Sequence, residues 1–197
     1  MQLTNVRAAA FTEVMAASDT GITLFDTAIG RCGVAWGHDG LLAIALPHSR
    51  DDRTRARLRR SAPQGTETVP PAPVRAAIDG IVALLGGDPT DLTGVALDFD
   101  GVVPFDRRVA AAARAVGPGE TVTYGELAAR IGAAGEAREV GTAMGRNRFP
   151  VVVPCHRVVA ADGRLGGFSA PGGTETKRRL LAIERRHAAG PLTLFAG

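Results

Sequence analysis

The segment that most constrains the fold is Pro150–Val159, which reads PVVVPCHRVV. Proline locks its own φ angle, so Pro150 and Pro154 fix the backbone on both sides of the valines. A cysteine and a histidine follow side by side, and in the extended strand that we expect here their side chains would point to opposite sides. A free thiol titrates at about pH 8.5, and a neighbouring imidazole that accepts its proton can raise the thiolate fraction. Cys155 is therefore either a nucleophile or a buried structural cysteine, and these residues alone leave both interpretations open.

The 197-residue length suits one good-sized domain or two small ones, and 45% hydrophobic with 22% charged residues is typical of a folded soluble protein. No apolar run approaches the roughly 20 residues that a membrane helix needs, so we predict no membrane association. The segment 1–20 lacks the clean apolar core of a signal peptide. With only two cysteines, the chain fits a reducing cytoplasm. Cys32 and His38 are too few ligands for zinc, and we predict neither metal nor cofactor.

Charge is unevenly distributed between the two halves of the chain. Residues 96–197 hold 14 Arg and Lys against 10 Asp and Glu, whereas residues 1–95 hold 9 against 10. The half that contains Cys155 is therefore the basic one. This excess favours a polyanionic partner, although such an excess also occurs in proteins that bind nothing charged.

The first half predicts a small antiparallel sheet with helices and nothing that indicates chemistry. The expected elements are strands over 22–26, 33–36 and 41–46, a helix over 51–61, an extended or loop segment over 64–73, a helix over 74–85 and a further strand over 95–99. We expect Asp100-Gly101 to be the hinge to a second domain.

The second half predicts mainly helices. Periodicity places helices over 105–116, 124–130 and 136–146, and a final helix through Arg186 that Thr174 or Thr176 would cap. Glu184 falls near the end of this last helix, where the helix dipole does not favour a carboxylate, so we expect it to have a partner. Thr123 and Glu126 match a capping box at the start of the second of these helices. Helix, short glycine-bearing turn and helix in a basic region are typical of a helix-turn-helix, although two packed helices with no ligand fit the same spacing.

The helix over 136–146 carries small residues, including Gly141, Ala143 and Gly145. A face of small side chains favours close, sequence-tolerant contact with the minor groove over reading of base edges in the major groove. Arg138 lies near the start of this helix and Arg146 at its end, where either could contact DNA.

The run Pro154-Cys155-His156-Arg157-Val158-Val159 resembles the active-site motif of the O6-alkylguanine-DNA alkyltransferases, and ordered matches continue over residues 105–184. The resemblance implies an α/β protein with two domains. Residues 1–100 would form a ribonuclease-H-like domain of a small sheet plus helices. Residues 101–197 would form a mostly helical helix-turn-helix domain that carries the active-site cysteine.

The resemblance also implies roles for individual residues. Cys155 would accept the alkyl group, His156 would take its proton through a water, and Glu184 would orient the histidine. Tyr124 would contact the target base and its phosphate, and Asn147 would join the recognition helix to the active-site turn. The remaining implied positions are DNA contacts at Arg138, Gly141, Met144 and Arg146, and a guanine pocket at Met144, Val158, Phe168 and Ser169.

A group on guanine O6 is buried in the base stack, so the resemblance implies that the target base is flipped out of double-stranded DNA. We therefore predict that the chain, as a cytoplasmic monomer, transfers an alkyl group once from O6 of guanine to Cys155, with O4 of thymine as a second target. Two alternatives stay open: a helix-turn-helix binder of alkylated DNA with an inert cysteine, and a cysteine hydrolase that uses Cys155, His156 and Glu184.

Overall fold

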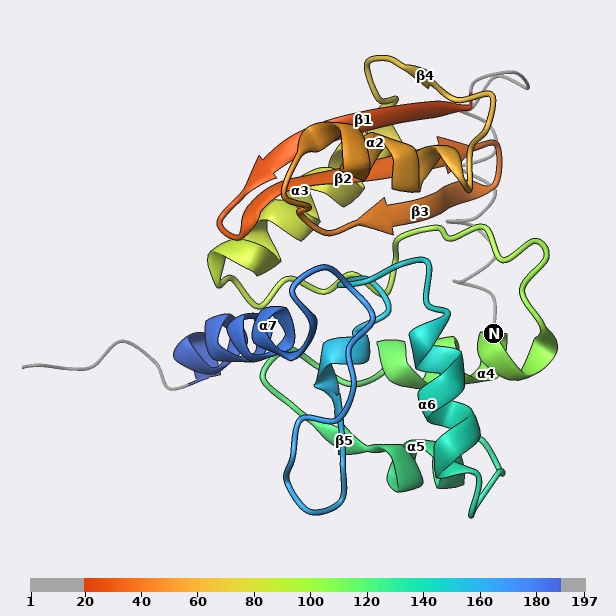
Figure 1. Cartoon of the computed structure of the whole chain (residues 1–197), viewed down its shortest axis with the longest axis vertical. Coiled ribbons are helices and arrows are strands. Elements are labelled where there is room, and N and C mark those ends of the chain that lie inside the picture. Colours follow the sequence, from red (N-terminus) through yellow and green to blue (C-terminus); the bar gives the residue numbers. More distant parts are fainter. Residues whose placement is uncertain (1–19, 189–197) are drawn as a thin grey trace, which may run out of the picture.

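A computed structural model describes residues 20–188 of the chain. One half of the molecule contains a small sheet with a helix on each face, and the other half is mostly helical (Figure 1). The expectation that the N-terminal segment is not a signal peptide falls on residues 1–19, which lie outside the described range.

The first half contains, in chain order, β1 Gly21–Thr27, β2 Gly30–Gly37, β3 Gly40–Ala45, α2 Asp51–Arg59, β4 Thr66–Glu67 and α3 Ala72–Gly86. The second half contains α4 Pro104–Arg114, β5 Val122–Thr123, α5 Tyr124–Arg130, α6 Ala137–Gly145, the 3-10 helix η1 Cys155–Arg157, β6 Val158–Val159 and α7 Gly173–Ala188.

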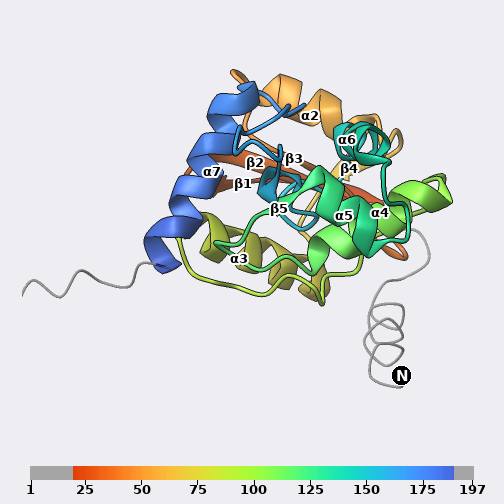
Figure 2. The same ribbon diagram turned by 90° about the horizontal axis from the view of Figure 1, so that it is seen from below.

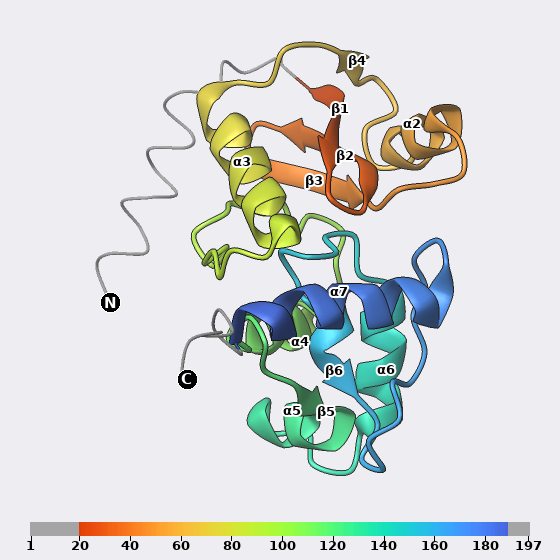
Figure 3. The ribbon, with the colours of Figure 1, turned by 90° about the vertical axis from the view of Figure 1, so that its left-hand side faces the viewer.

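The four-stranded sheet has the order β3-β2-β1-β4, in which β4 is parallel to β1 and the other neighbours are antiparallel. The period of two along β2 sends alternate side chains to opposite faces. Val34 and Trp36 join the core that α3 covers, whereas Ala35 joins a smaller core with Leu58 of α2. Figure 3 shows α3 and α2 on opposite faces of the sheet. The predicted three-strand meander and both predicted helices are therefore confirmed.

The helices of the second half follow their predicted positions closely. Thr123 caps α5, since its hydroxyl accepts a hydrogen bond from the Glu126 N–H and the Glu126 carboxylate accepts one from the Thr123 N–H. The predicted capping box is therefore confirmed. Seen from below, α7 lies on one side of this half and α4, α5 and α6 lie on the other, with β5 between them (Figure 2).

Three expectations about local structure are wrong. Segment 95–99 forms no strand: Leu97 makes an isolated bridge to Leu41 of β3, in which the Leu41 N–H donates to the Ala96 carbonyl and the Asp98 N–H donates to the Leu41 carbonyl. The final helix begins at Gly173, so Thr174 and Thr176 lie inside it rather than at its N-cap, and it runs on to Ala188.

The third correction concerns the backbone at Cys155 and His156. The sequence suggests an extended strand at Cys155 and His156, but both residues lie in η1, and the strand β6 begins only at Val158. Pro154 accepts the hydrogen bond of the Arg157 N–H, which closes this turn at 2.9 Å. β6 then pairs in parallel with β5, a pairing that the sequence does not predict.

Two arginines join the halves of the molecule. Arg148 donates to the carbonyls of Asp98 and Asp100 at 3.1 and 3.0 Å, which fastens the chain beside the predicted hinge. Arg179 of α7 donates to the carbonyls of Ala28 and Ile29 in the β1–β2 turn. Within residues 20–188, we find no helix with the length and apolar character needed to span a membrane.

Candidate active site

Asn147 shapes the turn that leads to Cys155. Its side-chain amide donates to the Val153 carbonyl at 2.8 Å, and its side-chain oxygen accepts the Phe149 N–H at 2.9 Å. Between these contacts Val151 adopts a φ of 78°, a left-handed conformation that is costly for a β-branched residue. Buried contacts and the two Asn147 hydrogen bonds hold the strained turn in place. They thereby position Cys155 at the start of η1.

Glu184 of α7 is the centre of a buried polar cluster. Its carboxylate lies 2.8 Å from His156 Nε2 and accepts three hydrogen bonds from the Arg157 guanidinium, between 2.8 and 3.2 Å. The Gly119 N–H donates to it at 3.2 Å, and Arg157 also donates to the Val116 carbonyl at 2.6 Å. The expectation that a carboxylate near a helix end has a partner is confirmed, although the arginine was not among the predicted partners.

The electrostatics of this cluster favour an ionised Glu184 beside a neutral His156. Burial opposes ionisation of Glu184, but the hydrogen bonds from His156 and Arg157 outweigh it and lower its pKa to about 2. Burial lowers the pKa of His156, with Glu184 acting in the opposite direction. His156 Nδ1 makes no hydrogen bond to any described residue, so this nitrogen is free to accept a proton.

The Cys155 sulfur lies among groups that stabilise a negative charge. Burial raises the pKa of the Cys155 thiol, while the Asn147 side chain, the Lys177 ammonium and the N–H groups of Cys155 and His156 lower it. The resting thiol is therefore protonated, and it needs a base to ionise.

Lys177 of α7 is a buried cation that the sequence reasoning missed. Its ammonium donates to the Val158 carbonyl at 2.6 Å and lies 5.8 Å from the centre of the Tyr124 ring. Burial lowers the pKa of Lys177 to about 8, against the influence of Cys155. The sequence does single this residue out in one way, because Lys177 is the single lysine among 23 basic residues.

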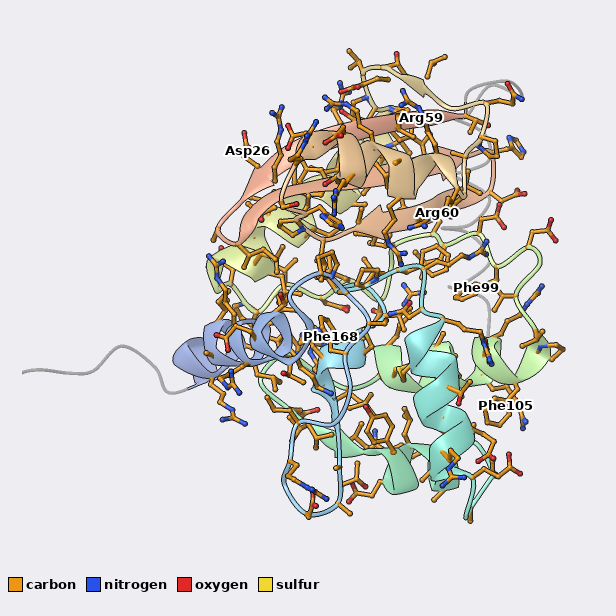
Figure 4. The ribbon with its side chains drawn as sticks, in the orientation of Figure 1. Asp26, Arg59, Arg60, Phe99, Phe105 and Phe168 are labelled. Carbon is orange, nitrogen blue, oxygen red and sulfur yellow. The ribbon has the colours of Figure 1, made fainter. Side chains whose placement is uncertain are left out.

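A pocket of about 820 Å³ opens beside Cys155. Its lining comes from α5, α6, η1 and the loop between β6 and α7, on which Figure 4 labels Phe168. The lining residues are Tyr124, Gly125, Ala137, Arg138, Gly141, Met144, Gly145, Cys155, Ala160, Ala161, Gly167, Phe168 and Ser169.

The ring of Tyr124 lies between α6 and the loop that leads to α7. A Cβ on Gly141 would make an ordinary contact with this ring, whereas a Cβ on Gly166 would come within 3.0 Å of it. Gly166 also has a φ of 68°, which a side chain would strain. Burial raises the pKa of Tyr124, with Cys155 adding to the effect, so its hydroxyl stays a hydrogen-bond donor.

The structure brings most, but not all, of the predicted site residues to this pocket. Arg138, Gly141 and Met144 line it from α6, and Arg138 is exposed. Arg146 does not line it, because its guanidinium binds both oxygens of Asp106 at 2.7 Å. Val158 does not line it either, because Val158 is fully buried, and its carbonyl accepts the hydrogen bond from Lys177. Among residues 20–188, no group of three or more His, Cys, Asp or Glu side chains could hold a metal.

Comparisons with known proteins agree on one family. Residues 104–186 match the model described as 6-O-methylguanine DNA methyltransferase, DNA binding domain. The chain is 38% identical over 152 residues to a methylated-DNA–protein-cysteine methyltransferase of Methanothermobacter thermautotrophicus, a match that covers 77% of this chain and 78% of the relative. It is 46% identical over 119 residues to the protein of that name from Mycolicibacterium paratuberculosis, covering 60% and 70%.

Solved structures give the same result at the level of the fold. The crystal structure of Mycobacterium tuberculosis OGT in complex with DNA superposes with a TM-score of 0.68 at 32% identity, covering 85% of this chain and 94% of that one. The structure of the O6-methylguanine methyltransferase from the same organism has a TM-score of 0.69 at 35% identity, covering 90% and 99%.

Proposed function

Because the chain belongs to the family of methylated-DNA–protein-cysteine methyltransferases, we propose that it repairs alkylated DNA by transferring the alkyl group from O6 of guanine to the sulfur of Cys155. The observation that carries this proposal is the position of Cys155 on an open pocket, beside a neutral histidine that Glu184 holds. The same displacement would act on O4 of thymine.

The proposed reaction is a nucleophilic displacement at the alkyl carbon. The Cys155 thiol gives its proton to Nδ1 of His156 through a bound water, as the resemblance to the family implies. Glu184 then stabilises the imidazolium. The thiolate attacks the alkyl carbon, so an S–C bond forms and the C–O bond breaks. The electron pair stays on guanine O6, where the Tyr124 hydroxyl can donate a hydrogen bond. The product is a thioether with no leaving group for water to displace, so each chain acts once.

We assign DNA binding to α5, the turn after it, and α6, which together would act as a helix-turn-helix in the minor groove. The small residues of α6 suit close approach to DNA, and the exposed Arg138 at the pocket rim could fill the space that a flipped guanine leaves. Phe168 and Ser169 would then contact the flipped base. Arg146 is a weaker candidate for a DNA contact, since it is already paired with Asp106.

The proposed domain division follows the two halves of the molecule. Residues 1–100, with the sheet flanked by α2 and α3, would be a ribonuclease-H-like supporting domain, and residues 101–197 would bind DNA and carry out the transfer. Arg148 and Arg179 would fix the angle between the two domains. We propose that the protein acts as a cytoplasmic monomer on double-stranded DNA.

The test follows the DNA product. A duplex with one O6-methylguanine is mixed with wild type, Cys155→Ala or the control Cys32→Ala, and the nucleosides are analysed. Wild type and Cys32→Ala should restore guanine, whereas Cys155→Ala should bind the duplex and leave the lesion intact. Demethylation by Cys155→Ala would overturn the proposal. Binding without demethylation by wild type would favour the inert binder, and turnover of a test ester would favour the hydrolase.

A further inference from the structure

A second, smaller cavity lies behind the wall of the substrate pocket. It has a volume of about 30 Å³ and lies between α4, α6 and the edge-to-face pair of Phe99 and Phe149. One water-sized group needs roughly 10–15 Å³ by this kind of measure, so the cavity can take the end of a side chain. Met144 lines both this cavity and the substrate pocket, and it is therefore the partition between them.

The cavity exists because two helices present alanines to it. Ala110 of α4 and Ala143 of α6 line it and are only 7% and 3% exposed, so larger apolar residues at either position would fill it. The cavity is partly open to solvent, since the exposed Arg146 is also among its lining residues. Two small residues on facing helices thus leave space next to Met144, which lines the substrate pocket on its other side.

Met144 is suited to use that space. Methionine is unbranched, has three rotatable side-chain bonds and adapts to irregular gaps. The backbone around it is less free to move, because the two hydrogen bonds between Arg146 and Asp106 tie the end of α6 to α4. Enlargement of the pocket on this side therefore falls to the Met144 side chain.

We propose that Met144 is a movable wall, which turns into the cavity behind it and lets the pocket accept O6 substituents much larger than methyl, such as benzyl. This inference rests on the proposed function and adds the class of substrate to it. A methyl group needs no such movement, so filling the cavity should affect large substituents selectively.

The experiment uses two duplexes of one sequence, with either O6-methylguanine or O6-benzylguanine at the same position, so that DNA contacts and base flipping are matched. Transfer rates are measured for wild type, for Ala110→Leu, which fills the cavity, and for Ala111→Leu, which adds the same bulk on the exposed face of α4. Ala110→Leu should slow benzyl transfer roughly tenfold or more and change methyl transfer by less than about twofold, within the range that steric exclusion from an apolar pocket gives. Ala111→Leu should change neither.

A rescue variant separates movement of Met144 from a general disturbance of α4. In Ala110→Leu with Met144→Ala the wall is already withdrawn, so benzyl transfer should recover. Thermal unfolding verifies that each variant is folded, and Ala143→Val fills the same cavity from α6 if Ala110→Leu does not fold. Equal slowing of both substrates, no slowing of either, or no rescue would overturn the inference. Wild type that transfers methyl but not benzyl would also overturn it, whereas wild type that transfers neither would instead defeat the proposed function.

Discussion

At the scale of single residues, Glu184 is the shared hydrogen-bond acceptor of the buried polar cluster. It accepts hydrogen bonds from Gly119, His156 and Arg157, three residues that belong to two distant segments of the chain. The sequence indicates that this carboxylate has a partner, because of its place near a helix end, but only the fold reveals that an arginine shares it. Glu184 is therefore expected to contribute both to stability and to the transfer rate.

The contribution to stability should disappear in acid. The pKa of Glu184 is about 2 in the folded protein against an ordinary value of 4.5. The unfolded chain takes up the proton first, so the contribution is complete above about pH 5 and is lost as the pH falls from about 4.5 towards 2. Its full size is on the order of 3 kcal/mol.

Urea unfolding between about pH 6 and pH 3 measures this effect. Wild type should lose stability more steeply than Glu184→Gln across that range, because the amide has no proton to bind. Glu175→Gln, at an exposed position of the same helix, is the control and should follow wild type. Parallel curves for wild type and Glu184→Gln would show that the carboxylate is not stabilised as described.

The contribution to rate should appear in single-turnover kinetics. Loss of a proton acceptor typically slows a reaction by roughly 10²-fold or more, so His156→Ala and Glu184→Ala should each slow transfer to Cys155. Because the two residues act as a unit, the double variant should be little slower than the slower single variant. Multiplicative effects would mean that Glu184 acts on the rate through something other than His156.

At the scale of elements, a variant of the exposed Arg138 on α6 can distinguish a role in binding DNA from a role in flipping the target base out of the duplex. If its side chain replaces the flipped guanine, Arg138→Ala should slow repair of paired duplex strongly and reaction with free O6-benzylguanine little, since a free base needs no flipping. Arg130→Ala removes an exposed arginine from α5, outside the pocket, and is the control. Equal slowing of Arg138→Ala on both substrates would assign this arginine to the fold or the pocket instead.

The sequence predicts those elements that depend on local signals. The capping box at Thr123 fixes the start of α5, and glycines end α3 near Gly87, which adopts a left-handed φ of 110°. Segment 95–99 is apolar enough for a strand, but tertiary context allows only the single bridge at Leu97. The 3-10 turn at Cys155 follows a segment in which the Asn147 side chain donates to the Val153 carbonyl and accepts from the Phe149 N–H, and no short-range pattern contains that information.

At the scale of the whole molecule, the pocket is assembled from segments that are distant in sequence, and this limits what a sequence can predict. Family resemblance gives Cys155, Tyr124 and Arg138 as neighbours, and they do line one pocket. It does not predict the hydrogen bond from the buried Lys177 to the Val158 carbonyl, or the ion pair of Arg146 with Asp106. Both contacts join elements whose packing against each other is not determined by the spacing of residues in the sequence. The cavity behind Met144 likewise exists only in the packed molecule.

The measurement that tests the central claim most directly is the intact mass of the protein after it is mixed with excess O6-methylguanine duplex, followed by peptide mapping. We predict that every chain gains one methyl group in place of a hydrogen, that the group maps to Cys155, and that the amount of guanine restored equals the amount of protein. Protein that stays unmodified while it demethylates several lesions per chain, or a methyl group that maps to Cys32 or any other residue, would contradict single-turnover transfer to Cys155.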